Sequence, residues 1–406
     1  MKKIYQIVVL TAFLTGIALC SSPSLYAVGY YNTEYGVRYY GTEEAMPAKA
    51  KVVPWGEIKV QYDDNVFLSK NDKKDDVIVT LTPGVTAYLP FSDNLLTFDY
   101  HVDFNRFQDN SSQDATNHHA YGGLKLNWRD VTFNIYDQFD HVFDRPSSED
   151  VTRIKRDDNR AGIIAKVEKD RLGIQLGYEN FKRDYKSDAI YDQFDRTDNI
   201  YSLMLTHQTF PKTKLLLEYD FDQIRYDHST TRSDGDYHQI LVGAIGQLTP
   251  KTTASIRAGY QFRSYENEGN PDFKTGVVYS DIMHKFSDRN AISLSLYRAA
   301  QESTYSTNNY YSVDNISGTF DHYFTVKLLG FITGMCQLHS YPTETTEDGE
   351  TKKRKDNYYS LGAGLKYYWQ KWLTTTLQAE HIIRNSNFGV FDYNENLVTL
   401  SAKAVF

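Results

Sequence analysis

Apolar and polar residues alternate along most of this chain, in segments that end at turn-forming residues. In the clearest segment, 373–383, Leu377 and Ala379 share one face, whereas Gln378 and Glu380 share the other. A period of two indicates β-strands, because successive side chains of a strand point to opposite faces. Strands that are apolar on one face and polar on the other, repeated without a helical stretch, predict a closed transmembrane β-barrel.

The pattern predicts an all-β fold, a single antiparallel up-and-down barrel of about eighteen strands, with sixteen as the alternative count. The predicted strands are 55–67, 76–89, 95–107, 117–128, 131–143, 158–168, 171–184, 197–208, 213–226, 236–248, 252–265, 272–286, 291–304, 309–323, 325–339, 356–369, 373–386 and 394–406.

Short and long connections alternate between these strands. Arg129-Asp130 and Lys169-Asp170 belong to the short set, and 144–157 and 340–355 belong to the long set. Outer-membrane barrels have short periplasmic turns and longer external loops. The 33 tyrosines suit a lipid–water boundary, and a tyrosine-rich soluble β-sandwich would give the same count. Such a sandwich has no reason to alternate short and long connections so regularly.

The polar faces of the strands predict the residues that line the lumen. These are Asp99, Asp103, Glu179, Glu218, Asp220, Asp222, Arg257, Arg263, Lys366, Glu380 and Arg384. Burying such charges in a dry interior would be costly, so we expect either a water-filled lumen or a loop that folds in and pairs with them. The two signs of charge either orient ions across a pore or neutralise each other on the wall. Asp137 breaks the alternation of its strand, and the residues of 273–286 do not divide cleanly into an apolar and a polar face. A bulge or a register shift is the expected explanation.

Aromatic residues mark one end of the predicted strands. Trp55, Trp128, Trp369 and Trp372 all fall at the ends that we expect to be periplasmic, where interfacial tryptophan is favoured. The chain ends at Phe406 on an alternating strand, a pattern similar to the signal that the barrel-insertion machinery reads. We therefore expect these tryptophans to be membrane-interface anchors and Phe406 to be an insertion signal.

The first residues predict export from the cytoplasm. Lys2 and Lys3 precede an apolar stretch, and small residues follow it, so 1–27 is the expected cleaved signal peptide of a Gram-negative outer-membrane protein. A membrane anchor and a lipoprotein signal at Cys20 are the alternatives. We expect 28–54 to be a periplasmic lead-in or a segment tucked into the lumen, and 55–406 to be the barrel.

Composition narrows the class of protein. The 406 residues are 41% hydrophobic and carry a net charge of −8, which fits a barrel that meets lipid with every second residue and excludes a nucleic-acid binder. Beyond the signal only Cys336 remains, so no internal disulfide is expected.

Acid–histidine neighbours such as Asp140-His141 point to opposite faces of a strand. No nucleophile elbow or HExxH motif occurs, so we expect no enzyme, no metal site and no cofactor.

The first strands carry a family resemblance. Residues 56–67, ending in Tyr62-Asp63-Asp64-Asn65-Val66-Phe67, and Thr82-Pro83-Gly84-Val85 resemble the start of the putative beta-barrel porin type 2 family. The resemblance implies an outer-membrane barrel that serves as a conduit for polysaccharide export, fed by a separate periplasmic export partner. General diffusion of small solutes and a non-conducting surface or adhesion barrel are the alternatives.

The expected surroundings follow from this placement. We expect contacts with outer-membrane lipid and lipopolysaccharide, and none with nucleic acid. The basic run at 352–355 predicts either contact with anionic lipopolysaccharide or glycan, or a solvated loop of mixed charge.

Overall fold

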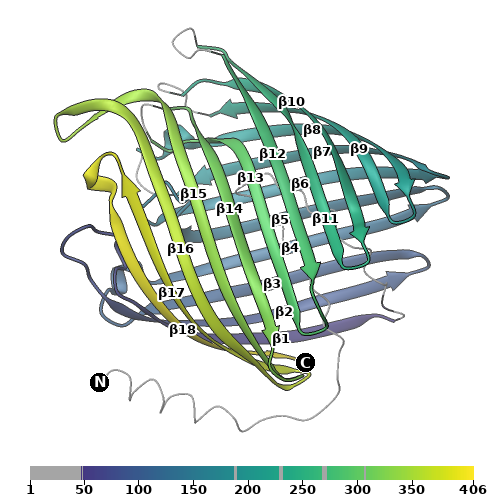
Figure 1. The fold of residues 1–406 in the computed structure, drawn as a ribbon, viewed down its shortest axis with the longest axis horizontal. Coiled ribbons are helices and arrows are strands. Elements are labelled where there is room, and N and C mark those ends of the chain that lie inside the picture. The colour runs from purple at the N-terminus through teal and green to yellow at the C-terminus, as the bar shows by residue number, and fades with distance from the viewer. Residues whose placement is uncertain (1–46, 48, 187–189, 228–231, 268–271, 306–307) are drawn as a thin grey trace.

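The computed structural model describes residues 47, 49–186, 190–227, 232–267, 272–305 and 308–406. Within them an 18-stranded antiparallel sheet closes on itself, because β1 pairs with β18 as well as with β2. Figure 1 shows the strands of the near wall crossing those of the far wall at a steep angle, as the tilt of barrel strands requires. The predicted up-and-down barrel of eighteen strands is confirmed, and the alternative of sixteen is excluded.

Each strand pairs with its neighbours in sequence. The strands are β1 (Lys51–Asp63), β2 (Asp76–Phe91), β3 (Asn94–Phe107), β4 (Ala115–Trp128), β5 (Val131–Asp144), β6 (Ile154–Lys169), β7 (Leu172–Tyr185), β8 (Arg196–Phe210), β9 (Thr213–Tyr226), β10 (Gly235–Thr249), β11 (Thr252–Tyr265), β12 (Phe273–Lys285), β13 (Asn290–Glu302), β14 (Tyr310–Tyr323), β15 (Leu328–Glu347), β16 (Glu350–Gln370), β17 (Leu373–Ser386) and β18 (Tyr393–Val405). Short 3₁₀ helices occur at η2 (Ser111–Gln113), η3 (Asp192–Phe194) and η4 (Gly389–Phe391). Among the residues that the structure describes, no helix is long and apolar enough to cross a membrane.

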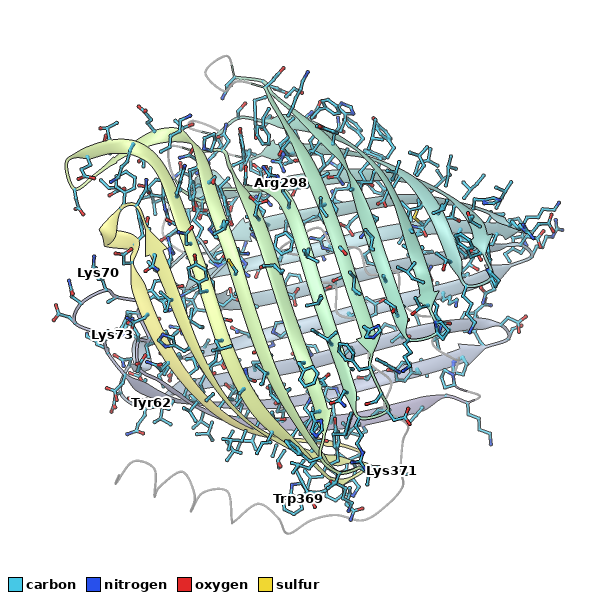
Figure 2. The ribbon with its side chains drawn as sticks, in the orientation of Figure 1. Tyr62, Lys70, Lys73, Arg298, Trp369 and Lys371 are labelled. Carbon is cyan, nitrogen blue, oxygen red and sulfur yellow. The ribbon has the colours of Figure 1, made fainter. Side chains whose placement is uncertain are left out.

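The short connections lie at one end of the barrel, which we call the short-turn end, and the long connections lie at the other, which we call the long-loop end. At the short-turn end, Arg129 and Asp170 adopt positive φ angles of 56° and 54°, a geometry that lets a tight turn follow the twist of a β-hairpin. Figure 2 shows Trp369 and Lys371 together at this end, whereas Lys70 and Lys73 lie at the long-loop end. The predicted alternation of short and long connections is present, with the exception described next.

The expected loop over 340–355 is wrong. This region forms the outer parts of β15 and β16, which meet in a tight turn where Asp348 and Gly349 have φ angles of 52° and 80°. Glu344 pairs with Lys353 in the register of this hairpin. The hairpin projects beyond the rest of the barrel wall (Figure 1), so its strands need no apolar face, and the alternation that marks the other strands is absent there.

The start of the barrel also differs from the expectation. β1 begins at Lys51, inside the expected lead-in of 28–54. The expected signal peptide, 1–27, and residues 28–46 and 48 of the expected lead-in lie outside the described residues.

Outer and inner faces of the strands follow the predicted alternation. On β7 the apolar side chains of Leu172 and Leu176 are 64% and 55% exposed on the outer face, whereas Gln175 is buried on the inner face. Asp137 is exposed on the outer face, where Asn159 donates a 2.7 Å hydrogen bond to it. The register of β5 with both neighbours is continuous, so the expected bulge at Asp137 is wrong.

Candidate functional site

A cavity of about 490 Å³ lies inside the barrel, lined by side chains from β4 to β14 and by the beginning of the segment that joins β5 to β6. The predicted lumen residues that line it are Glu179, Glu218, Asp220, Asp222, Arg257 and Arg263. The alternating pattern thus placed residues from β7, β9 and β11 on one surface, although they are far apart in sequence.

Most charges on the cavity wall are paired. Arg257 lies 3.2 Å from Glu218, and the two side chains are 4% and 2% exposed. Arg183 lies 2.7 Å from Asp158. Further pairs join Arg156 to Asp158, Arg160 to Glu179 and Arg263 to Glu302. Of the two expected arrangements, mutual neutralisation on the wall therefore describes these groups.

An acidic row follows the inner face of β9. Glu218, Asp220 and Asp222 occupy successive inward positions, all of them buried and lining the cavity. Gln239 on β10 donates a 3.2 Å hydrogen bond to Asp220. Asp222 Oδ1 has no hydrogen-bond partner among the described residues. This row is the most acidic stretch of the cavity wall.

The wall next to this row, from β10 to β15, carries an apolar and aromatic cluster that comprises Leu241, Val277, Tyr279, Tyr297, Ala299, Tyr311, Val313 and Tyr341. Leu241, Tyr279, Ala299 and Tyr311 of this cluster line the cavity. The segment 273–286 does not alternate cleanly because β12 carries Val277 and Tyr279 on its inner face, so apolar residues occur on both faces of this strand. The register of β12 with β11 is continuous, so a register shift is not the explanation.

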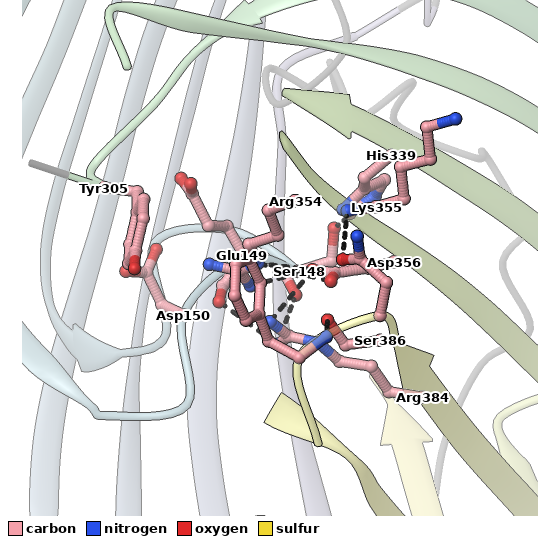
Figure 3. A network of polar contacts seen from close by, with 12 residues as sticks. Ser148, Glu149, Asp150, Tyr305, His339, Arg354, Lys355, Asp356, Arg384 and Ser386 are labelled. Atoms are coloured by element: carbon pink, nitrogen blue, oxygen red, sulfur yellow. Dashed lines mark hydrogen bonds and ion pairs between the residues drawn. The ribbon is translucent and has the colours of Figure 1, made fainter. Parts of the chain in front are cut away.

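The segment 145–153, between β5 and β6, crosses the lumen and is tied to distant strands. The Glu149 carboxylate accepts hydrogen bonds from the Ser303 hydroxyl at 2.6 Å and from the Thr304 backbone N–H at 2.9 Å. Arg384 on β17 donates to the Glu149 carbonyl oxygen at 3.1 Å, and also contacts Asp356. Figure 3 shows Glu149 with Arg384 and Asp356. We call the contacts of Glu149 with Ser303, Thr304 and Arg384 the Glu149 latch. Arg384 was predicted to line a lumen, but sequence reasoning missed the latch because its partners meet only in the closed barrel.

The same segment is tied to the first long connection. Arg145 donates a 2.7 Å hydrogen bond to the carbonyl oxygen of Val66, which is fully buried. Asn65 holds that connection in place through hydrogen bonds of its side chain to the carbonyl oxygens of Ser69 and Asn394, both 2.8 Å. The residues that carried the family resemblance thus serve as a docking point for 145–153.

The other predicted lumen residues lie on the inner face outside this cavity. Asp99 and Asp103 on β3 contact His101 and His119. Lys366 and Glu380 are partly exposed on β16 and β17, on the same faces as the buried Asp356 and Arg384.

Three of the four tryptophans occupy the expected positions at the short-turn end. Trp128 and Trp369 are 62% and 50% exposed on the outer surface, and Trp372 stacks on Phe406 with ring centroids 6.1 Å apart. Their role as interface anchors, and that of Phe406 in insertion, stays a prediction.

The expectation for Trp55 is wrong, because its ring faces the lumen. Its ring centroid lies 5.2 Å from that of His101, and Lys403 lies over the indole at 4.4 Å. The alternation of β1 indicates this inward orientation. Trp55 shares its face with Glu57, Lys59 and Gln61, whereas Val52, 60% exposed, lies on the other face.

Acid–histidine neighbours point apart, as the strand geometry requires. His119 on the inner face bonds to Asp140 at 2.6 Å, whereas His141 on the outer face bonds to Asp157 at 2.5 Å. Across the part of the chain that the structure describes, no group of His, Cys, Asp or Glu has the geometry to hold a metal ion.

Comparison with known proteins identifies similar barrels. A family model described as "Putative beta-barrel porin 2" matches residues 51–406. Among curated proteins, none matches this sequence. The crystal structure of the outer membrane protein OpdK from Pseudomonas aeruginosa is similar with a TM-score of 0.52 and 11% identity, covering 88% of this chain and 99% of that one. A structure of Pseudomonas aeruginosa OpdK with vanillate has a TM-score of 0.50 and 12% identity over the same shares. At such identities the likeness concerns the fold alone.

Proposed function

The chain belongs to the putative beta-barrel porin 2 family and is a porin-like β-barrel of the outer membrane, and from this premise we propose that it is a channel for hydrophilic solutes. The signal peptide at 1–27 is part of this proposal, since an outer-membrane protein must be exported. The family match extends over every strand of the barrel, so the proposal concerns the barrel as a whole.

The observation that carries the proposal is the charged wall of the internal cavity. Arg257 and Glu218, together with the acidic row of β9, line a space of about 490 Å³ in the middle of the barrel. Removing ions from water costs several kcal/mol each, and pairing alone rarely recovers that cost. Other charged groups on the wall stay partly exposed, such as Asp140 and Asp144 at 21% and 46%, so water in the lumen hydrates them and gives hydrophilic solutes a path.

The segment 145–153 favours small solutes. It lies inside the barrel, held by the Glu149 latch on one side and by Arg145 at Val66 on the other. A solute that passes must fit beside it, whereas a bulky polymer needs the latch to open.

A second candidate is polysaccharide export. It is supported by the resemblance of 56–67 and 82–85 to the family's first strands, and by the inward-facing Trp55, whose ring suits a sugar. In this reading a periplasmic partner delivers the polymer to the short-turn end.

Planar-bilayer recording of the purified full-length protein tests the channel. We expect discrete conductance steps that depend on salt concentration. A protein that inserts into the bilayer and stays electrically silent would be a surface barrel without a conducting path, and the channel proposal would be abandoned.

Deletion of the gene separates the two candidates. Export predicts loss of a surface glycan in the deletion strain. General diffusion predicts an unchanged glycan and slower uptake of small hydrophilic solutes.

A further inference from the structure

We propose that a row of rings on the inner wall, formed by Trp55, His101 and His119, binds the sugar ring of a saccharide on its way through the lumen. This inference rests on the proposed channel function and adds a substrate class to it. It starts from the position of Trp55, one of the four tryptophans, on the inner face of its strand rather than on the lipid face.

The row is continuous across strands β1 to β4. Trp55 and His101 have ring centroids 5.2 Å apart, and His101 and His119 stack with centroids 4.6 Å apart at an interplanar angle of 16°. Trp55 pairs with Gly84, Gly84 with His101, and His101 with His119 in the strand register. The three rings therefore follow one line across the wall.

Gly84 makes this line possible. A Cβ atom at Gly84 would lie 2.3 Å from Cε2 of Trp55, so the indole lies directly on the bare backbone of β2 and reaches across it to His101. One face of the indole is thus fixed against the wall. Over the indole lies the amino group of Lys403, which is exposed and sits on a flexible stem.

Carboxylates border the rings. Asp99 accepts hydrogen bonds from Thr86 and from His101, the last at 3.1 Å. Asp103 lies 3.6 Å from His119 Nε2, and Asp140 lies 2.6 Å from His119 Nδ1. The side chains of Asp103 and Asp140 are 28% and 21% exposed, so they retain acceptor capacity toward the lumen.

The row leads into the central cavity. His119 and Asp140, at its far end, also line that cavity. Trp55, at the near end, lies close to the start of β1 at the short-turn end. A ligand on the row would therefore be on a path between the mouth at the short-turn end and the cavity.

This combination suits a saccharide. A hexopyranose ring has an apolar C–H face that packs on an aromatic ring, and hydroxyl groups at its edge that donate to carboxylates. A small organic cation fits less well, because the ammonium of Lys403 beside the indole repels it, whereas a neutral sugar ring can displace this flexible side chain without charge repulsion. A flat aromatic solute would gain nothing from the acceptors Asp103 and Asp140.

The test is single-channel recording of the full-length protein with maltohexaose as the probe, added to each side of the bilayer in turn. We expect transient current blocks whose duration falls by roughly tenfold in Trp55→Ala and partly in Trp55→Phe. The matched control is Trp128→Ala, which removes an outward-facing indole at the same end of the barrel and should leave the block duration unchanged. Unitary conductance without sugar shows whether each variant still forms the pore.

The outcomes separate this inference from the channel proposal. If the unmodified protein does not conduct, the channel proposal itself fails. If it conducts but maltohexaose blocks it equally in Trp55→Ala, the ring row is not a saccharide site. Blocks by tetramethylammonium or benzoate that depend on Trp55, without blocks by maltohexaose, would assign the row to cations or to aromatic solutes and overturn the inference.

Discussion

Arg384 on β17 donates a hydrogen bond of 3.1 Å to the carbonyl oxygen of Glu149, in the segment between β5 and β6. The two residues are far apart in sequence, and the bond joins a segment inside the lumen to the barrel wall. The Glu149 carboxylate is bound on its other side by Ser303 and Thr304. The segment 145–153 is therefore fixed by polar contacts within the barrel, and such contacts can be removed one at a time.

Loss of the latch should widen the channel. Glu149→Ala removes the acceptor for Ser303 and Thr304, at a cost of about 1–3 kcal/mol for the docked segment. We expect larger or more frequent high-conductance steps in planar bilayers. The control is Arg298→Ala, which breaks an ion pair with Asp314 on the outer surface, where both side chains are exposed, and should leave conductance unchanged. Equal conductance in Glu149→Ala would mean that the segment does not limit the pore.

The latch should also respond to pH through Asp150. Burial and the neighbouring Glu149 carboxylate raise the pKa of Asp150 from 3.8 to about 6, although hydrogen bonds from Thr304 and Ser147 and the charge of Arg183 act in the opposite direction. The Asp150 carboxylate therefore binds a proton more tightly when the segment 145–153 is docked than when it is undocked. This contribution to docking is complete below about pH 4 and is lost as the pH rises through about 6.

We therefore expect lower conductance at pH 5 than at pH 7.5. Asp150→Asn, which resembles the protonated form, should keep the low conductance at both values. A pH response that survives in Asp150→Asn would assign it to another group.

Gly84 should tolerate no side chain. Gly84→Ala would force the indole of Trp55 off the backbone of β2, at a cost of about 1–3 kcal/mol. We expect a lower unfolding temperature in detergent and shorter maltohexaose blocks. Gly276→Ala is the matched control, because its Cβ would meet only the Gly259 carbonyl oxygen, at 4.0 Å. Equal destabilisation by both substitutions would refute the close approach of Trp55 as the cause.

The acidic row of β9 should favour cations. Replacing Asp220 and Asp222 by asparagine removes negative charge from the cavity wall while keeping the side-chain shape. We expect the reversal potential in a salt gradient to move toward anion preference. Asp137→Asn removes a carboxylate from the outer face and should not move it. An unchanged reversal potential in the double variant would indicate that ions do not pass along β9.

The amino-acid sequence by itself determined the barrel. Successive side chains of a strand point to opposite faces, and a barrel with lipid outside and water inside selects apolar residues for one face and polar residues for the other. The face of each residue in strands such as β9 and β17 could therefore be predicted from the sequence. It also placed Glu218 and Arg257 on the inner face. It failed on the β15–β16 hairpin, which projects beyond the barrel and has no lipid to select an apolar face.

Only the tertiary structure decided what the inner face does. Glu149 meets Ser303 and Arg384 because closure of the barrel brings strands far apart in sequence to one lumen, and no local pattern encodes such contacts. The same holds for Trp55, which reaches His101 only because register places Gly84 between them. Periodicity fixes which face a side chain takes, whereas register and closure fix which side chains share that face.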